Sequence, residues 1–269
     1  MKEKYMVMDV ALCHDCNNCF MACTDEHANN YWPGYQKAMP WHGHRWMNIE
    51  RRERGENDRI DVAFLAKPCM QCGDANCAKI GDFVSSREDG IVTFDIDRGK
   101  GKDISTSCLY DAIYWNEEEQ VSQKCDFCAH LLDDPSWEHR VPRCVHLCPT
   151  GSLKFYNEEP SDFEKRITEE RLEAYMPELE CKPHVWYKNL HRFTKNFVAG
   201  QLLRDGDVLP GIIVSISGYG APEQKESDMF GEFRFDGLED GEYALSVEHK
   251  EIARVRVNGG SKDIGDITI

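Results

Sequence analysis

The residues of this chain that could do chemistry are its cysteines, and their spacing indicates metal–sulfur chemistry. The sequence contains 13 cysteines, all within its first 181 residues. The first group reads Cys13-His-Asp-Cys16-Asn-Asn-Cys19-Phe-Met-Ala-Cys23, which is a CxxCxxCxxxC pattern. Three closely spaced thiolates can hold three corners of an iron–sulfur cube from one loop, and the fourth then serves a different cluster. The spacing therefore predicts iron–sulfur clusters.

The remaining cysteines lie in three further stretches. The last stretch ends in Cys-Pro, and a proline at that place suits the first turn of a helix. We interpret the final cysteine, Cys181, as a single thiol without partner cysteines. In chain order the others are Cys69, Cys72 and Cys77, then Cys108, and then Cys125, Cys128, Cys144 and Cys148.

Two other uses of cysteine fit this pattern less well. A disulfide framework is typical of short secreted chains with an even number of cysteines. Here the number is odd, and the start MKEKYMVMDVALC has no signal peptide. Structural zinc sites use CxxC pairs, two per metal, and need no third close cysteine. A zinc-structured scaffold is the alternative to iron–sulfur clusters.

The elements that must position these cysteines are expected in residues 1–199, as a multi-cluster domain. We predict an aromatic insertion at 24–68 and a connector at 157–199 within it. Trp41 and Trp46 in the insertion suit a subunit interface, because Trp is enriched in interface cores. The alternative is that these rings cover a small core whose interior is mostly inorganic.

Short strands are predicted at residues 5–12 and 90–96, and a charged, helix-compatible pattern covers 158–182. The composition changes at about residue 200, where short alternating runs are separated by turns that contain glycine. Residues 200–269 are therefore predicted to form a small antiparallel β-sandwich. The expected fold class is α+β.

Charge and composition exclude several classes of partner. The formal net charge is −16, from 32 basic and 48 acidic residues, which argues against nucleic acid and anionic membrane surfaces. No apolar run approaches the ~18 residues that a membrane span needs, and a cytoplasmic location is expected. The chain has no GxSxG elbow or phosphate-binding loop, so we predict no catalytic residue in it and expect a catalytic partner.

From about Tyr5 to Tyr156 the chain resembles the iron–sulfur electron-transfer subunits of molybdopterin oxidoreductases, the dimethyl sulfoxide reductase superfamily. Subunits of that family carry four cysteine motifs for four 4Fe-4S clusters in a duplicated bacterial ferredoxin-like fold. Motifs one and four are matched in full, whereas motif two lacks its last cysteine and motif three keeps only Cys108. The four positions that lack the family's cysteine are Gly81, Arg98, Gly101 and Ile104.

The resemblance implies how the ligands are shared, because three cysteines of one motif are joined by the last cysteine of its partner motif. All four missing positions belong to one cluster, so the other three clusters are complete. The implied ligand sets are Cys13, Cys16, Cys19 and Cys148 for the first cluster, Cys125, Cys128, Cys144 and Cys23 for the second, and Cys69, Cys72, Cys77 and Cys108 for the third.

The tail from Asp207 through Val247 resembles the carboxypeptidase-regulatory or collagen-adhesin B-type (Cna-B-like) sandwich. A chain with three clusters and such a tail is similar to the small subunits of molybdopterin transhydroxylases. These enzymes move a hydroxyl group between aromatic rings. The resemblance implies a large catalytic subunit, in a heterodimer or multiples of it, that binds molybdenum through two molybdopterin guanine dinucleotides. Two alternatives stay open: the small subunit of another molybdopterin reductase or dehydrogenase, and a free-standing polyferredoxin.

Overall fold

The computed structural model of the protein describes residues 1–220 and 222–269. The described chain forms two compact units. The cysteine unit comprises Met1–Glu50 and Phe64–Leu190, and the β unit comprises Arg51–Ala63 and His191–Ile269. All 13 cysteines lie in the cysteine unit, and none forms a disulfide.

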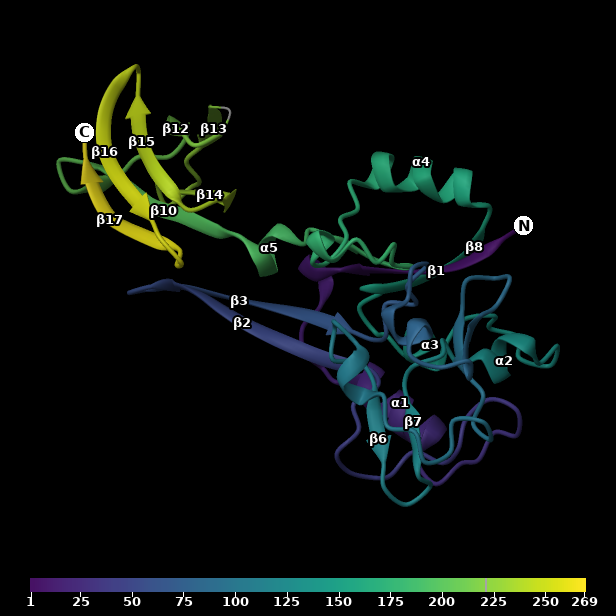
Figure 1. Ribbon diagram of the computed structural model, residues 1–269. Coiled ribbons are helices and arrows are strands. Elements are labelled where there is room, and N and C mark those ends of the chain that lie inside the picture. The colour runs from purple at the N-terminus through teal and green to yellow at the C-terminus, as the bar shows by residue number, and fades with distance from the viewer. Residues whose placement is uncertain (221) are drawn as a thin grey trace. The chain divides into compact units, whose positions relative to one another are not determined.

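A three-stranded sheet with strand order β8-β1-β9 forms the frame of the cysteine unit. β1 (Glu3–Asp9) pairs antiparallel with β8 (Leu153–Glu158) and parallel with β9 (Val185–Lys188). Its centre, Tyr5 to Met8, is buried on both faces. Helix α4 (Pro160–Glu170) covers one face, where Phe163 stacks on Tyr5 with ring centroids 3.7 Å apart. Figure 1 shows β1 and β8 side by side with α4 above them.

Short elements carry the cysteines of this unit, because cysteine loops rather than long helices have to surround the clusters. Two small hairpins and three short helices alternate with single turns of 3-10 helix. They are α1 (Asn18–His27), β4 (Val84–Ser86) with β5 (Val92–Phe94), β6 (Tyr114–Asn116) with β7 (Val121–Gln123), α2 (Ala129–Asp133), α3 (Arg143–His146), and the turns Val10–Leu12, Asn76–Lys79, Ser105–Ser107 and Pro177–Leu179.

Apolar side chains fill part of the region where the family's fourth cluster would have its cysteines. Phe83 and Ile104, 3% and 4% exposed, belong to one buried core cluster with Phe94. A Cβ added at Gly81 would lie 2.4 Å from the Phe83 ring. Arg98 forms an ion pair with its neighbour Asp82. Packed side chains thus surround Gly81 and Ile104, whereas Arg98 and Gly101 are exposed.

A long hairpin belongs partly to each unit. β2 (Asn48–Glu56) and β3 (Arg59–Lys67) form a two-stranded sheet, and residues 51–63 at its tip are counted with the β unit. The sequence alone predicted an aromatic insertion at 24–68 and a β domain that begins at 200, whereas the β unit also takes in 51–63 and 191–199. Charged contacts of Arg54, described below, tie the tip to the rest of that unit.

The β unit consists of two four-stranded sheets around a shared core. One has β10 (Asn196–Arg204) between β14 (Glu232–Leu238) and β17 (Lys262–Thr268), with β11 (Asp207–Val208) also paired to β10. The other has the order β13-β12-β15-β16. Its strands are β13 (Glu223–Glu226), β12 (Ile213–Gly218), β15 (Gly241–Val247) and β16 (Lys250–Val257). The short helix α5 (His191–Thr194) precedes β10.

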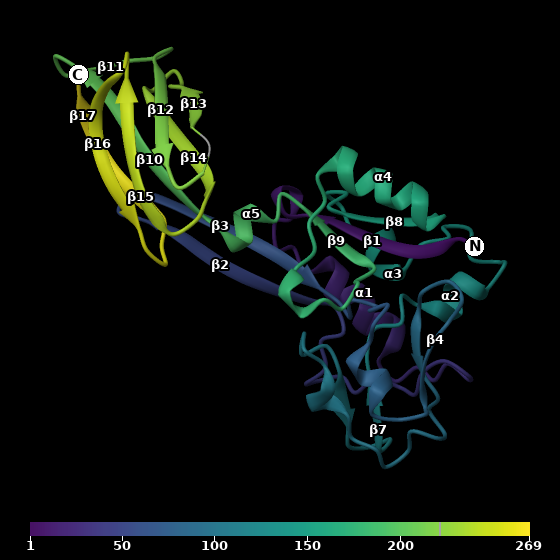
Figure 2. The same cartoon turned by 45° about the horizontal axis from the view of Figure 1, so that its top comes forward.

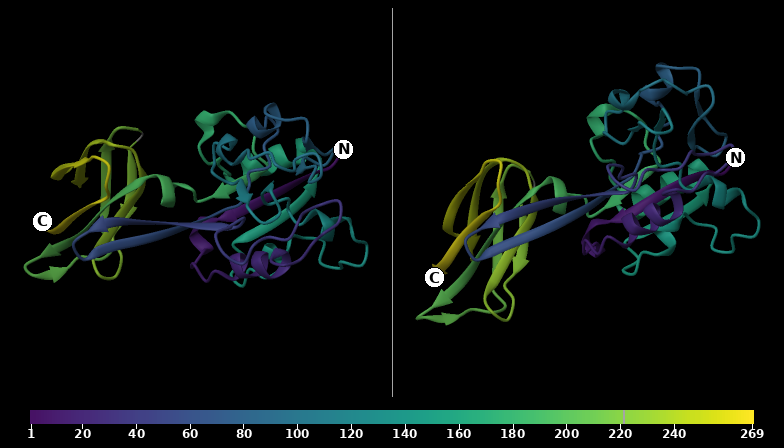
Figure 3. Two further views of the ribbon diagram at one scale, coloured as in Figure 1. Left: turned by 60° about the horizontal axis from the view of Figure 1, so that its bottom comes forward. Right: turned by 90° about the horizontal axis from the view of Figure 1, so that it is seen from below.

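The core of the β unit follows from the alternation of its strands. Phe233 and Phe235 of β14 face Val214 of β12 and Leu245 of β15, and all four are at most 4% exposed. Polar residues occupy the intervening positions, which is the pattern of a sheet with one face buried. Figures 2 and 3 show the strands of the β unit in two layers. A β-rich region is therefore present where the sequence predicted one, but it is not wholly antiparallel, because β10 and β17 pair in parallel.

Candidate iron–sulfur sites

The first predicted ligand set surrounds one cavity. Cys13, Cys16, Cys19 and Cys148 all line one small cavity in the cysteine unit. Asn17, with φ of 58°, lies in the left-handed region, so the loop turns tightly before α1 begins at Asn18. The last turn of α3 and the following residues bring Cys148 to the same place from the far end of the sequence.

The second predicted set is buried. Cys23, Cys125, Cys128 and Cys144 are each at most 8% exposed. Burial raises the pKa of the Cys23 thiol well above its ordinary value, and the nearby Cys128 and Cys125 raise it further. The pKa of Cys144 is likewise raised by burial and then by Cys125 and Cys23. Each of these two pKa values is therefore raised by other thiols of the same predicted set.

Backbone groups of the second loop are arranged to donate to sulfur. The amide of Phe127 donates a hydrogen bond to the Cys125 Sγ at 3.4 Å. Phe127 and Cys128 have φ of 57° and 52°, in the left-handed region, so this loop turns tightly. Amide hydrogen bonds to sulfur are one of the factors that set the reduction potential of an iron–sulfur cluster.

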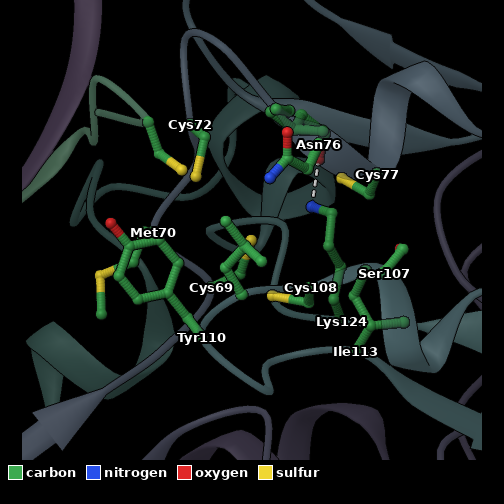
Figure 4. A pocket seen from close by; sticks show the side chains of 14 residues that line it. Cys69, Met70, Cys72, Asn76, Cys77, Ser107, Cys108, Tyr110, Ile113 and Lys124 are labelled. Atoms are coloured by element: carbon green, nitrogen blue, oxygen red, sulfur yellow. Dashed lines mark hydrogen bonds between the residues drawn. The ribbon is translucent and has the colours of Figure 1, made fainter. Parts of the chain in front are cut away.

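The third predicted set also lines a single small cavity. Figure 4 shows the sulfur atoms of Cys69, Cys72, Cys77 and Cys108 around the same space. The amide of Ala112 donates to the Cys108 Sγ at 3.4 Å. The structure therefore brings together Cys69, Cys72, Cys77 and Cys108.

A buried cation shares the third cavity. Lys124 is 1% exposed and lines the cavity together with the cysteines. Its ammonium donates to the carbonyl oxygens of Val92 and Cys125, the latter at 3.1 Å. No ion pair with a carboxylate is present for Lys124 among residues 1–220 and 222–269. A buried ammonium is unfavourable without an anion, and a cube held by four thiolates is anionic.

The donors fit a four-iron cube better than a single metal ion. Zinc needs its ligands about 2.3 Å from one point, yet no three His, Cys, Asp or Glu side chains of the described part of the chain converge on one ion. A cube instead binds each thiolate at its own corner, so the thiols can surround a wider cavity. Burial raises the pKa of Cys77 to about 11 and that of Cys72 above the ordinary range. A raised pKa favours the protonated thiol, so each of these thiols must lose its proton when it binds the metal.

The sequence pattern did not indicate one residue that lines the third cavity. Cys181 was expected to have no partner cysteines, which is wrong: it lines the same cavity as Cys72. Its backbone carbonyl accepts a hydrogen bond from the amide of Asp74, at 3.2 Å. Spacing could not reveal this neighbour, because Cys181 lies far along the chain from every other cysteine and in no motif.

The two tryptophans expected at an interface have different surroundings. Trp46 is 2% exposed and packs against the buried His27 ring, with centroids 4.7 Å apart. Trp41 is 57% exposed. Trp46 therefore belongs to the packing beside Cys23, and only Trp41 is available at the surface of this chain.

No helix of the described residues is long and apolar enough to cross a membrane.

Comparison with known proteins gives the family context of these sites. A family model described as a 4Fe-4S dicluster domain matches residues 60–158. The chain is 50% identical to the pyrogallol hydroxytransferase small subunit of Pelobacter acidigallici, over 92% of this chain and 91% of that protein. It is 28% identical to a subunit of tetrathionate reductase from Salmonella typhimurium, over 69% and 72%. It is also 28% identical to the iron–sulfur cluster-binding subunit of menaquinone reductase from Nitratidesulfovibrio vulgaris, over 68% and 87%.

Proposed function

The chain belongs to the family of the pyrogallol hydroxytransferase small subunit, and from this premise we propose that it is the electron-transfer subunit of a molybdopterin-dependent pyrogallol–phloroglucinol transhydroxylase. In this proposal it binds three 4Fe-4S clusters, and the catalytic site lies in a large partner subunit. The observation that carries the proposal is the grouping of twelve cysteines into three sets of four in one compact unit.

The proposed ligands are those that the resemblance implies. Cys148 joins the first group from a distant part of the sequence, and Cys23 in the same way joins the second. When bound, the clusters would carry electrons one at a time. The protein holds them in place, excludes water and sets their potentials with amides and charges.

Contacts between the loops support an order of first, second and third set along an electron path. Cys19 of the first set lies close enough to Cys144 of the second to raise the pKa of Cys144, after burial and its own set's Cys125 and Cys23. The buried Gln71, next to Cys72, donates to the carbonyl oxygen of Cys125 at 2.7 Å. The loops of neighbouring sets are therefore in direct contact.

The first set is the proposed side of contact with the partner. Cys16 is exposed, whereas all cysteines of the second set are buried. Leu12 and Leu147, next in sequence to Cys13 and Cys148, are 42% and 39% exposed. An exposed ligand flanked by apolar side chains suits a surface that a large subunit covers.

The proposed partner binds molybdenum through two molybdopterin guanine dinucleotides and converts pyrogallol to phloroglucinol with a tetrahydroxybenzene cosubstrate. Because hydroxyl transfer between two rings is redox-neutral overall, we propose that this chain sets or restores the redox state of the partner's metal. Stopped-flow spectra that show obligatory cluster reduction and reoxidation in every turnover would contradict this role. The cytoplasmic location stays a prediction.

For the β unit we propose a Cna-B-like sandwich with a structural or docking role. Two sheets with a shared apolar core support the sandwich. The unit presents many ion pairs and no cysteine, which suits a solvated support rather than an electron path.

The test is purification of the chain with its partner under anaerobic conditions. We expect about twelve iron and twelve acid-labile sulfide per small subunit, a co-purifying large chain with molybdenum, and conversion of pyrogallol to phloroglucinol. A complex that holds molybdenum but acts only on another substrate would favour a different molybdopterin reductase. A chain that purifies alone with its iron would favour a polyferredoxin.

A further inference from the structure

The cavity of the third ligand set contains a fifth thiol. Cys181 lines this cavity together with Cys69, Cys72, Cys77 and Cys108, and it is 5% exposed. We propose that Cys181 is a reserve iron ligand, whose sulfur takes the place of Cys72 when the bond between Cys72 and its iron opens. The inference rests on the third cluster of the proposed function.

Backbone hydrogen bonds fix Cys181 beside the loop that carries Cys72. The amide of Asp74 donates to the carbonyl of Cys181 at 3.2 Å, and the amide of Gly73 donates to the carbonyl of Lys182 at 2.8 Å. These bonds hold the two segments next to each other at the residues that directly follow Cys72. The position of Cys181 is therefore set by the backbone and does not depend on a flexible side chain.

Among the five thiols, Cys72 is a close neighbour of Cys181. Both side chains line the same cavity, and the two backbone hydrogen bonds hold the Cys181 segment against Gly73 and Asp74, which directly follow Cys72. This proximity selects Cys72 as the ligand that Cys181 can replace.

The corner of the cavity near Cys181 is also the one that solvent can reach. Asn76, Tyr110 and Cys181 line both the cluster cavity and an open groove on the surface of the cysteine unit. Cys72 itself is half-buried. Chelators and oxidants that enter through the groove would meet this corner first, so a second thiol is useful here.

The thiol of Cys181 has a hydrogen-bond acceptor beside it. Its Sγ donates a hydrogen bond to the carbonyl oxygen of Leu179 at 3.2 Å. In the exchange, the bond from iron to the Cys72 sulfur breaks and a bond from iron to the Cys181 sulfur forms. The Cys181 proton passes to the released Cys72 thiolate, so no electron is gained or lost.

The experiment compares variants of the anaerobically purified complex by iron content and by electron paramagnetic resonance of the reduced clusters. Cys72→Ala is expected to keep the wild-type iron content with altered spectra of the third cluster. The matched variant Cys77→Ala, which has no spare thiol, is expected to lose about four iron. The double variant Cys72→Ala/Cys181→Ala should lose the same amount of iron as Cys77→Ala.

Loss of about four iron from Cys72→Ala alone would overturn the inference. A wild-type complex that already holds only about eight iron would instead refute the third cluster of the proposed function. If Cys72→Ala fails to assemble, Cys181→Ala is compared with the wild-type complex during exposure to an iron(II) chelator. A faster loss of the third-cluster signal in Cys181→Ala than in the wild type supports a reserve ligand. Equal rates in the two proteins overturn it.

Discussion

The ammonium of Lys124 donates to the carbonyl oxygen of Cys125 at 3.1 Å while it lines the cavity of the neighbouring ligand set. The same lysine therefore connects a proposed ligand of the second cluster with the site of the third. A positive charge at this place stabilises the more negative, reduced state of a cluster. The effect is large because the ammonium is 1% exposed and little screened by water.

We predict that Lys124→Met lowers the reduction potential of the third cluster. A unit charge about 6 Å away at an effective dielectric constant of about 20 contributes on the order of 100 mV. The control is Lys102→Met, because Lys102 lies over the Phe83 ring at 5.1 Å but its side chain is 51% exposed. Redox titration followed by electron paramagnetic resonance should show a shift in the first variant and little in the second. Equal shifts would show that the burial of Lys124 has no special effect.

The proposed sharing of ligands between distant motifs can be tested by paired substitutions. Cys148→Ala should remove the same cluster signal as Cys13→Ala, although these residues are far apart in sequence. Cys23→Ala should instead give the same loss as Cys128→Ala, despite lying close to Cys13 and Cys19. Spectra of the reduced complexes are compared pairwise. If Cys23→Ala matched Cys13→Ala, the pairing would be wrong.

Phe83→Ala should destabilise the cysteine unit by about 3–5 kcal/mol. Phe83 is 3% exposed, and its ring fills the space next to Gly81 and Gly99, in the region that lacks the cysteines of the family's fourth cluster. Calorimetry of the complex would measure the change. Ile80→Ala is the control, since Ile80 is 59% exposed and should change stability by less than about 0.5 kcal/mol.

Arg54→Met should destabilise the β unit by about 3 kcal/mol, the lower end of the range for a broken buried ion pair. The Arg54 side chain is 1% exposed and lies 2.7 Å from Asp61 and 2.8 Å from Asp236. The two carboxylates are 15% and 23% exposed, so water partly compensates them. Hydrogen exchange of residues 51–63 should rise in this variant. Arg254→Ala, which removes an exposed pair with Glu251, should leave that exchange unchanged.

The same cluster of charges predicts an acid-sensitive contribution to stability. Burial alone would raise the pKa of Asp61, but hydrogen bonds from Arg234 and Arg54 outweigh burial and hold this pKa well below its ordinary value. Burial alone would also raise the pKa of Asp236, but the hydrogen bond and charge of Arg54, together with the charge of Arg234, outweigh burial and lower this pKa. A carboxyl group whose pKa is lower in the folded than in the unfolded chain stabilises the fold at pH values above its unfolded pKa of about 4. This stabilisation is lost as the pH falls below that value toward the folded-state pKa.

We therefore expect the stability difference between wild type and Arg54→Met to be constant near neutral pH and to shrink as the pH falls below about 4. Thermal unfolding of the β unit, followed at several pH values in both proteins, measures this difference. A difference that does not change with pH would mean that Arg54 stabilises the unit through packing alone.

Much of the fold and of the site could be predicted from local pattern. Alternating runs such as GEFRF correspond to β14, and the charged pattern after residue 158 contains α4. Period-two and period-3.6 patterns report which face of a strand or helix is buried. The hairpin β2–β3 was missed within the predicted insertion, because its polar sequence NIERRERGE has little apolar alternation.

Residue types and local spacing were enough to predict the metal–sulfur chemistry, because a thiol is recognisable from its residue type and CxxCxxC spacing is a property of one loop. Which other groups reach those loops became visible in the folded chain alone. Lys124 and Cys181 come to the third cavity through a buried side chain and through backbone hydrogen bonds between distant segments. Contacts between residues far apart in the chain depend on the packing of the whole unit, so no spacing rule reports them.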